Sequence, residues 1–214
     1  MKLTLKGILV AKKQEVKTTN YMQNVNKSMK SITVFANDPG SRNSGFAIVK
    51  GTLDKRRRLQ IKVVKNGMLF KLVTQLKDNA TLNKEAEEFK QTIVKIVNKF
   101  GIDQIIIERF MTRGLGGPLI EIVSVMIGLV LGIVPVQAIP AVTWKVWAKK
   151  QSLDLDAMYK AARVPPHQVD SVCMAIFKLA KELDAKIVKF NNKKLLAIIE
   201  ATSTTKLKNK RKPK

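Results

Sequence analysis

The sequence predicts an α/β domain with a mixed, five-stranded sheet and helices on both faces. Three apolar runs, at residues 31–37, 44–50 and 56–70, are separated by polar and turn residues and come first. Two shorter apolar runs, at residues 102–108 and 133–139, then alternate with segments of helical periodicity. A three-strand antiparallel meander followed by strand and helix units gives a mixed sheet covered by helices.

The first three runs have the features of strands. Asp38-Pro39-Gly40 lies between the first two and is good turn chemistry. The third run alternates apolar and polar residues, and we expect a turn at its Asn66-Gly67.

The remaining elements follow from periodicity and from helix-ending residues. Residues 83–100 place apolar side chains at helical spacing, and Gly101 ends that helix. The nearly all-apolar run 102–108 is typical of a strand with both faces covered. Further helices are expected within 114–132, at 140–150, at 154–163, and from Pro166 to residue 183.

We expect three parts in the chain. Residues 1–30 form a lysine-rich, basic N-terminal arm, and residues 31–184 form the folded domain. Residues 185–214 form a basic C-terminal extension whose last residues are expected to be disordered.

The charge of the chain indicates a polyanionic partner. The formal net charge is +24, from 40 Lys and Arg against 16 Asp and Glu. Phosphate backbones are the favoured partner; an anionic membrane surface or a ribosome-bound role fits the same number. The single cysteine, Cys173, excludes an internal disulfide and a cysteine-based zinc site, and is consistent with a reducing compartment.

No membrane or secretory segment is expected. Lysines interrupt the short apolar stretch near the N-terminus, unlike a secretory signal. The longest apolar segment, residues 122–134, is shorter than the roughly 20 residues that span a bilayer. We therefore expect a cytoplasmic protein, not a secreted one, and a buried helix at this segment.

Four side chains form a candidate site. Asp38 ends the first strand and Glu108 the fourth, while His167 and Asp170 lie three residues apart on one helix face. If the two strands are neighbours, their carboxylates meet, and crowded carboxylates repel, so that one becomes protonated unless a cation holds them. Mg²⁺ suits such ligands, and two ions about 3.5–4 Å apart promote phosphodiester cleavage. On so basic a chain, the set suggests a metal-dependent nuclease.

Each of these residues also has an ordinary structural role. Asp38 suits a turn, and Glu108 suits the first exposed position after a strand. His167 can be an ordinary residue at the start of a helix, and Asp170 suits the same position because the helix dipole favours negative charge there. The consistent order of all four favours the site.

Three motifs resemble those of RuvC-type Holliday junction resolvases. "SITVFANDPGSRNSGFAIV" is similar to the first motif, in which a strand ends in Asp-Pro-Gly-Ser. "IDQIIIERFM" resembles the second, a hydrophobic strand that ends in the catalytic Glu. "HQVDSVCMAIF" resembles the last, with an acidic or His residue three positions before an Asp. The resemblance covers about residues 31–184.

The resemblance implies an RNase H-like fold, a homodimer, Mg²⁺ or Mn²⁺ with two ions in each active site, and nicking of four-way DNA junctions. By position, it assigns the metal and catalytic roles to Asp38, Glu108, His167 and Asp170. Phe110 matches an aromatic that contacts bases at the junction, although a buried core Phe is the alternative. The apolar helix at residues 119–131 corresponds to the dimerisation helix, with a monomer core as the alternative.

Basic residues near these motifs are candidate DNA contacts. Arg42, Arg109 and Arg113 accompany the first two motifs. Lys145 and Lys149 lie at helical spacing and are candidate phosphate contacts, with a solvated helix face as the alternative.

The chain departs from the compact bacterial enzymes in its basic arm, its C-terminal segment and the stretch 143–147. These additions are similar to those of phage or viral relatives, which implies a host-cell cytoplasm and a possible preference for other branched DNA. Alternative functions are an RNase H-fold nuclease that acts on RNA or an RNA–DNA hybrid, and a non-catalytic nucleic-acid-binding protein. An actin-like phosphotransferase is disfavoured because the chain is too short for two lobes.

Overall fold

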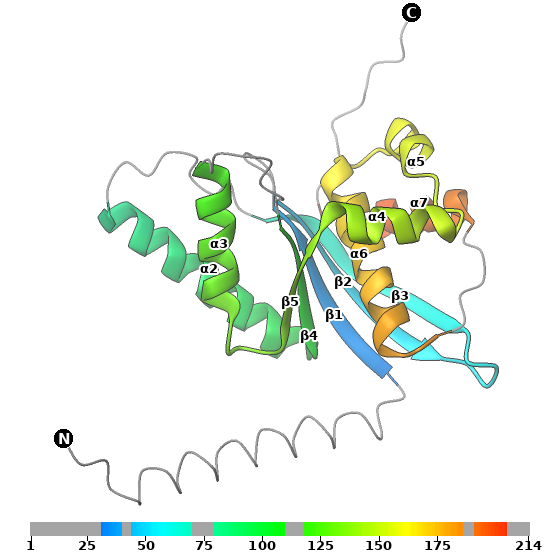
Figure 1. The fold of residues 1–214 in the computed structure, drawn as a ribbon, viewed down its shortest axis with the longest axis horizontal. Helices are drawn as coiled ribbons and strands as arrows, with labels where there is room; N and C mark the ends of the chain where they lie inside the picture. The colour runs from blue at the N-terminus through cyan, green and yellow to red at the C-terminus, as the bar shows by residue number, and fades with distance from the viewer. Residues whose placement is uncertain (1–30, 40–43, 70–78, 110–117, 186–190, 205–214) are drawn as a thin grey trace, which may run out of the picture. The chain divides into compact units, whose positions relative to one another are not determined.

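The computed structural model describes residues 31–39, 44–69, 79–109, 118–185 and 191–204 (Figure 1). The predicted basic arm at residues 1–30 and the end of the C-terminal segment lie outside the described residues. The strands are β1 Ser31–Asp38, β2 Ser44–Leu53, β3 Leu59–Leu69, β4 Gln104–Arg109 and β5 Val136–Pro140.

These strands form one mixed sheet in the order β3-β2-β1-β4-β5. Strand β1 pairs in parallel with β4, and β4 in parallel with β5. The meander β1-β2-β3 is antiparallel. The predicted fold class is therefore confirmed, including the adjacency of the first and fourth strands on which the candidate site depends.

The predicted turn at Asn66-Gly67 is wrong. Both residues lie inside β3, which pairs with β2 along its whole length. The Asn66 side-chain amide donates to the backbone carbonyl of Ile199 and to Thr202 Oγ1, at 3.0 and 2.7 Å. These partners are far away in the sequence, so they override a turn signal that is purely local.

The chain reverses instead between β2 and β3, at residues 54–58. Asp54 Oδ1 accepts the backbone N–H groups of Arg56 and Arg58, each at 2.8 Å. Arg57 has a positive φ of 59°. An aspartate that accepts backbone N–H groups two and four residues ahead stabilises a tight reversal without glycine.

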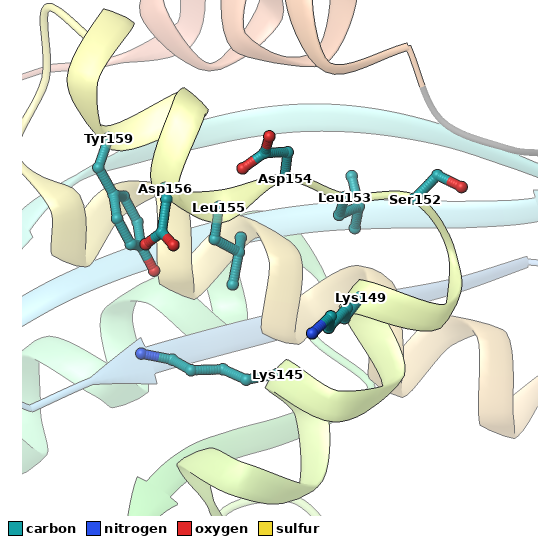
Figure 2. Close-up of a pocket in the computed structure, with 8 residues that line it drawn as sticks. All are labelled: Lys145, Lys149, Ser152, Leu153, Asp154, Leu155, Asp156 and Tyr159. Carbon is teal, nitrogen blue, oxygen red and sulfur yellow. The ribbon is translucent and has the colours of Figure 1, made fainter.

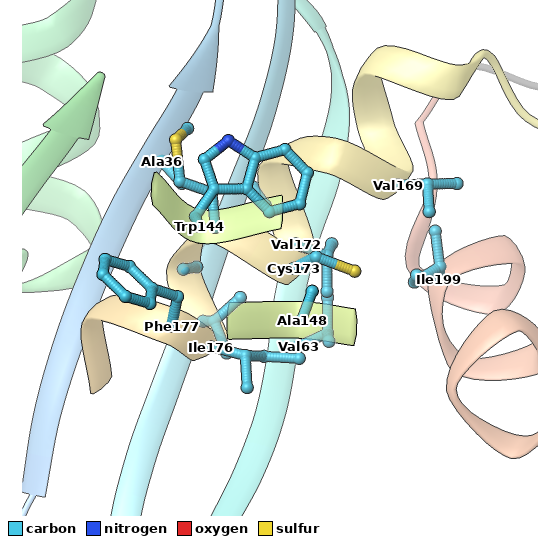
Figure 3. Close-up of a cluster of buried hydrophobic side chains, with 14 of the residues drawn as sticks. Ala36, Val63, Trp144, Ala148, Val169, Val172, Cys173, Ile176, Phe177 and Ile199 are labelled. Atoms are coloured by element: carbon cyan, nitrogen blue, oxygen red, sulfur yellow. The ribbon is translucent and has the colours of Figure 1, made fainter. Parts of the chain in front are cut away.

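Six helices are described: α2 Asn79–Phe100, α3 Pro118–Val130, α4 Ala141–Lys150, α5 Leu155–Ala161, α6 Pro166–Glu182 and α7 Asn192–Thr202. Helices α2 and α3 cover one face of the sheet, and α4 and α6 cover the other (Figure 1). Each face has its own apolar core, because successive strand residues point to opposite sides. The core beneath α4 and α6 is shown in Figure 3.

Helix α7 lies in the segment that the sequence suggested was an extension. Asn191 caps it by accepting the backbone N–H of Lys194 at 3.0 Å. Leu195, Leu196 and Ile199 are buried and join the core beneath α4 and α6. The packed part of the domain therefore includes α7.

The apolar helix α3 is buried on one side. Val123, Met126 and Val130 are buried, whereas Val125 is 40% exposed, and Leu131, just beyond the helix, is 61% exposed. Among the described helices, none combines the length and apolarity needed to cross a membrane.

Candidate active site

The ends of β1 and β4 place two carboxylates side by side. Asn37 pairs with Ile107 in the parallel register, so Asp38 and Glu108 are the next pair along. Strand alternation directs both side chains to the face of the sheet that carries α6, the face shared by Ala36 and Ile106. Both are buried, with exposures of 3% and 8%.

Helix α6 delivers the other two predicted residues. Pro166 at the first helical position favours the start of the helix there. His167 lies in the first turn, and its Nδ1 is 2.7 Å from Asp38 Oδ2. Asp170 follows one turn later and is 7% exposed. The structure therefore brings Asp38, Glu108, His167 and Asp170 to one end of the sheet.

Gly45 allows α6 to approach the sheet this closely. A Cβ at this position would overlap the backbone carbonyl of His167 and would lie 2.7 Å from His167 Cβ. Glycine is therefore required at the start of β2, because any side chain would push the first turn of α6 away from Asp38.

Asp170 is held by two donors from the helices beside α6. Lys145 Nζ of α4 lies 3.1 Å from Asp170 Oδ2. The Tyr159 hydroxyl of α5 donates to Asp170 Oδ1. Both carboxylate oxygens therefore have a partner within the protein.

Glu108 has a donor of its own. Trp144 Nε1 donates to Glu108 Oε2 at 2.8 Å. The Trp144 side chain is fully buried in the apolar core beneath α4 and α6, which also contains Ala36 and Cys173 (Figure 3). An indole N–H in such a position needs an acceptor, and the buried carboxylate supplies it.

The crowding raises the pKa values of two acids. Burial, followed by the charge of Asp38, raises the pKa of Glu108 to about 7, against the opposing effect of the Trp144 hydrogen bond. Burial also raises the pKa of Asp170, although the hydrogen bond from Tyr159 and the charge of Lys145 oppose it. Nearby negative charge and low solvation both disfavour the ionised carboxylate.

The pKa values of the two basic groups are raised as well, which for these groups favours the charged form. The hydrogen bond to Asp38 raises the pKa of His167, against the effect of burial. Burial alone would lower the pKa of Lys145, but the charge of Asp170 and its hydrogen bond raise it, with smaller contributions from Glu108 and Asp38. Lys145 therefore feels the charge of all three acids.

Sequence reasoning missed Trp144 and Tyr159. An indole or phenol on a helix carries no local signal that separates a core residue from a donor to a carboxylate. Lys145 was predicted to contact DNA phosphates, and here its ammonium group contacts Asp170. The position of α4 over the strand ends is a tertiary property, which spacing along the helix does not reveal.

Of the other predicted DNA contacts, Lys149 and Arg109 are exposed, and the rest lie outside the described residues. Lys149 is exposed and lines, with Lys145 and Tyr159, a cavity of about 540 Å³ between α4 and α5 (Figure 2). Arg109 is exposed at the end of β4. The predicted contacts outside the described residues are Arg42, Phe110 and Arg113.

The donor set suits a hard divalent cation. Three carboxylates and an imidazole are ligands that Mg²⁺ or Mn²⁺ accepts. The raised pKa of Glu108 comes first from burial and then from the charge of Asp38, and a bound cation would oppose both effects. Within the ranges that the structure describes, however, no three Asp, Glu, His or Cys side chains converge closely enough to hold one ion together. In this arrangement Glu108 and Asp170 already have donors within the protein.

No protein-family model and no curated protein sequence matches the chain. Its fold is similar to that of Thermus thermophilus RuvC in complex with a Holliday junction substrate, with a TM-score of 0.52 and 18% identity over 71% of this chain and 96% of that chain. A second structure of Thermus thermophilus RuvC gives a TM-score of 0.51 and 12% identity over 72% of this chain and 98% of that chain. The yeast mitochondrial Holliday junction resolvase gives a TM-score of 0.41, with 15% identity over 78% of this chain and 87% of that chain.

The similarity to RuvC confirms the predicted RNase H-like fold. At such low sequence identity, the similarity to RuvC concerns only the arrangement of strands and helices. The chemistry of the site has to be argued from the side chains themselves.

Proposed function

We propose that this protein is a metal-dependent endonuclease that cuts four-way junctions or other branched DNA by phosphodiester hydrolysis. One observation carries the proposal: Asp38, Glu108, His167 and Asp170 lie together at the strand ends of a RuvC-like sheet. Burying three carboxylates is costly, even with the hydrogen bonds and ion pairs that they form here on a protein with a net charge of +24. A site that binds divalent cations and acts on a polyanion would account for these buried carboxylates.

Each residue has a role in this proposal. The carboxylates of Asp38, Glu108 and Asp170 and the imidazole of His167 would hold Mg²⁺ or Mn²⁺, with two ions in each site. When bound, such ions activate a water molecule and stabilise the leaving oxygen. His167 orients Asp38 through their hydrogen bond, and burial beneath α4 keeps bulk water away from Glu108.

The basic surface supplies affinity for DNA. Lys149 and Arg109 are exposed near the acidic cluster and are proposed to bind phosphates. Arg42, Phe110 and Arg113 are proposed contacts on the strength of the motifs alone. Because phosphate contacts release counterions, junction affinity should fall steeply with salt; similar affinities at low and moderate salt would contradict the proposal. We also propose a homodimer, with the exposed apolar side chains near the end of α3 at its interface.

A substrate panel tests the activity directly. The full chain is incubated with four-way, flapped and duplex DNA and with an RNA–DNA hybrid, with Mg²⁺ and with a chelator. Symmetric nicks in the four-way junction that require Mg²⁺ are the expected result.

The alternatives give different patterns. Cleavage of the hybrid alone would indicate an RNase H activity. Binding to branched DNA without cleavage under any metal condition would indicate a non-catalytic binding protein and overturn the proposal.

A further inference from the structure

Lys145 lies at the candidate site and is the basic side chain there to which the proposed reaction assigns no role. It comes from α4, which crosses the end of the sheet, and its ammonium group contacts Asp170 at 3.1 Å. It also feels the negative charge of Glu108 and Asp38. A single positive charge therefore contacts one of the three buried acids and interacts electrostatically with the other two.

The surroundings hold this lysine in place. Trp144, the preceding residue, is fully buried and donates to Glu108. The Lys145 ammonium lies 5.1 Å from the centre of the Trp144 ring, a favourable distance for a cation over an aromatic face. Helix α4 thus places two consecutive side chains on two of the carboxylates, with Trp144 on Glu108 and Lys145 on Asp170.

We propose that Lys145 is a built-in counter-cation that neutralises the acidic cluster in the metal-free protein and competes with the divalent cation for Asp170. This inference rests on the proposed metal site. It explains why the acids do not converge on one point in this structure: Lys145 and Tyr159 hold Asp170, and Trp144 holds Glu108.

Competition follows from electrostatics. An ammonium group and a divalent cation within a few Å of the same carboxylate repel each other strongly in a partly buried site. Metal binding must therefore displace the Lys145 ammonium from Asp170 or weaken their contact. The work of displacement lowers the apparent affinity for the metal, and by reciprocity the metal loosens Lys145.

The structure has space for the displaced Lys145 side chain. Lys145 lines the cavity of about 540 Å³ between α4 and α5, and its side chain is 40% exposed (Figure 2). Lys149 lies one turn further along α4 on the same wall. A flexible lysine can therefore leave Asp170 for solvent without disturbing the core.

Calorimetric titration of the metal-free full chain with Mn²⁺ tests this proposal. Lys145→Met removes the charge and should tighten Mn²⁺ binding about tenfold, within the usual range of coupling between two sites. Lys145→Gln should behave likewise, whereas Lys145→Arg keeps the charge and should stay close to wild type. Lys149→Met, on the same helix, should change the affinity by less than about twofold, as expected for an exposed charge.

Thermal melting gives a second readout. In the presence of a chelator, Lys145→Met should melt below wild type because the acids lose their counter-charge. Saturating Mn²⁺ should raise its melting temperature more than that of wild type, since at one ligand concentration tighter binding stabilises the native state more, by RT ln(1 + [L]/Kd). Equal shifts in the two proteins would contradict competition.

The outcomes separate this inference from the proposed function. Equal or weaker Mn²⁺ binding by Lys145→Met and Lys145→Gln, with binding still lost in Asp38→Asn, would overturn the role of Lys145 and leave the metal site standing. The absence of any Asp38-dependent binding in wild type and in both variants would overturn the metal site and this inference together.

Discussion

The two faces of the sheet are built from the same strands and yet differ in chemistry. On the face covered by α2 and α3, the core consists of side chains such as Phe35, Ile93, Ile105 and Met126. On the face covered by α4 and α6, an apolar core of similar character ends in acids. Among the described residues, all three buried carboxylates, Asp38, Glu108 and Asp170, belong to this second face.

Because of this difference, substitutions on the two faces should have different effects on folding stability and on catalytic activity. Burying charge is costly, and a sheet that needed only a core would use apolar residues on both faces, as the α2 and α3 side does. Changes on the α2 and α3 side should therefore affect folding alone. Changes at the acidic end should affect activity and pH dependence more than folding.

The largest expected effect is on cleavage. Asp38→Asn or Glu108→Gln should reduce Mg²⁺-dependent cleavage of branched DNA by roughly a thousandfold or more, as the loss of catalytic groups does in other enzymes. Junction binding should persist, because these acids contact no phosphate directly. Cleavage rates and gel-shift affinities measure the two properties separately.

Asp103→Asn is the matched control for these variants. Asp103 precedes β4 and accepts the backbone N–H of Thr33 at 2.7 Å, at the opposite end of the same strand pair. Its replacement should affect stability and leave the cleavage rate near wild type. A cleavage rate equal to wild type in Asp38→Asn would contradict the assignment of Asp38 to the catalytic site.

The pH dependence of stability should come mainly from the acidic end. Glu108, Asp170 and His167 have raised pKa values, so the metal-free native protein holds more protons than the unfolded chain. Stability should therefore decrease as the pH rises through the window from 4.5 to about 7 set by Glu108. For Glu108 alone the effect is on the order of 3 kcal/mol.

Denaturant unfolding in a chelator at several pH values measures this slope. Glu108→Gln should flatten it, whereas Glu88→Gln, an exposed change on α2, should preserve it. A slope that is unaltered in Glu108→Gln would show that the acid is not perturbed as the structure indicates.

The same substitution, glycine to alanine, can be made on each side of the sheet. Gly45→Ala should destabilise the fold by about 2 kcal/mol, as overpacking does, and should move His167 away from Asp38. Gly128→Ala in α3 meets no atom within 4 Å and should be neutral or stabilising by up to about 1 kcal/mol. Melting curves and cleavage assays of both variants test this; equal behaviour would refute the close packing of α6 on β2.

The smallest expected effect concerns Trp144. Trp144→Phe keeps much of the buried ring and removes the donor to Glu108, which should cost about 1–2 kcal/mol when that carboxylate is charged. The cost should shrink at about pH 5, where Glu108 is protonated. Trp147→Phe is the control, since Trp147 packs edge-on against Phe177 at 5.5 Å. A pH-independent cost in Trp144→Phe would mean that the hydrogen bond to Glu108 contributes little.

The strand ends and the helix face that form the candidate site could be predicted from the sequence. Asp38 and Glu108 each end an apolar strand, and two parallel neighbours necessarily end at the same edge of the sheet. The spacing of His167 and Asp170 places both on one side of α6. These inferences needed only local periodicity and one assumption about strand order.

The contributions of α4, α5 and α7 could not be predicted in this way. The donors Trp144, Lys145 and Tyr159 reach Glu108 and Asp170 because of how α4 and α5 pack beside α6. Asn66 was misassigned for the same reason, since its partners lie in and around α7. Long-range packing decided these contacts, and it leaves little trace in local spacing.

The most direct test of the central claim is a crystal structure of the full chain with Mn²⁺, in which anomalous scattering locates the ions. We predict anomalous peaks bound by Asp38, Glu108 and Asp170, with the Lys145 ammonium displaced from Asp170. At saturating Mn²⁺, a structure without a peak at these carboxylates and with Lys145 still on Asp170 would contradict the assignment of a metal-dependent active site.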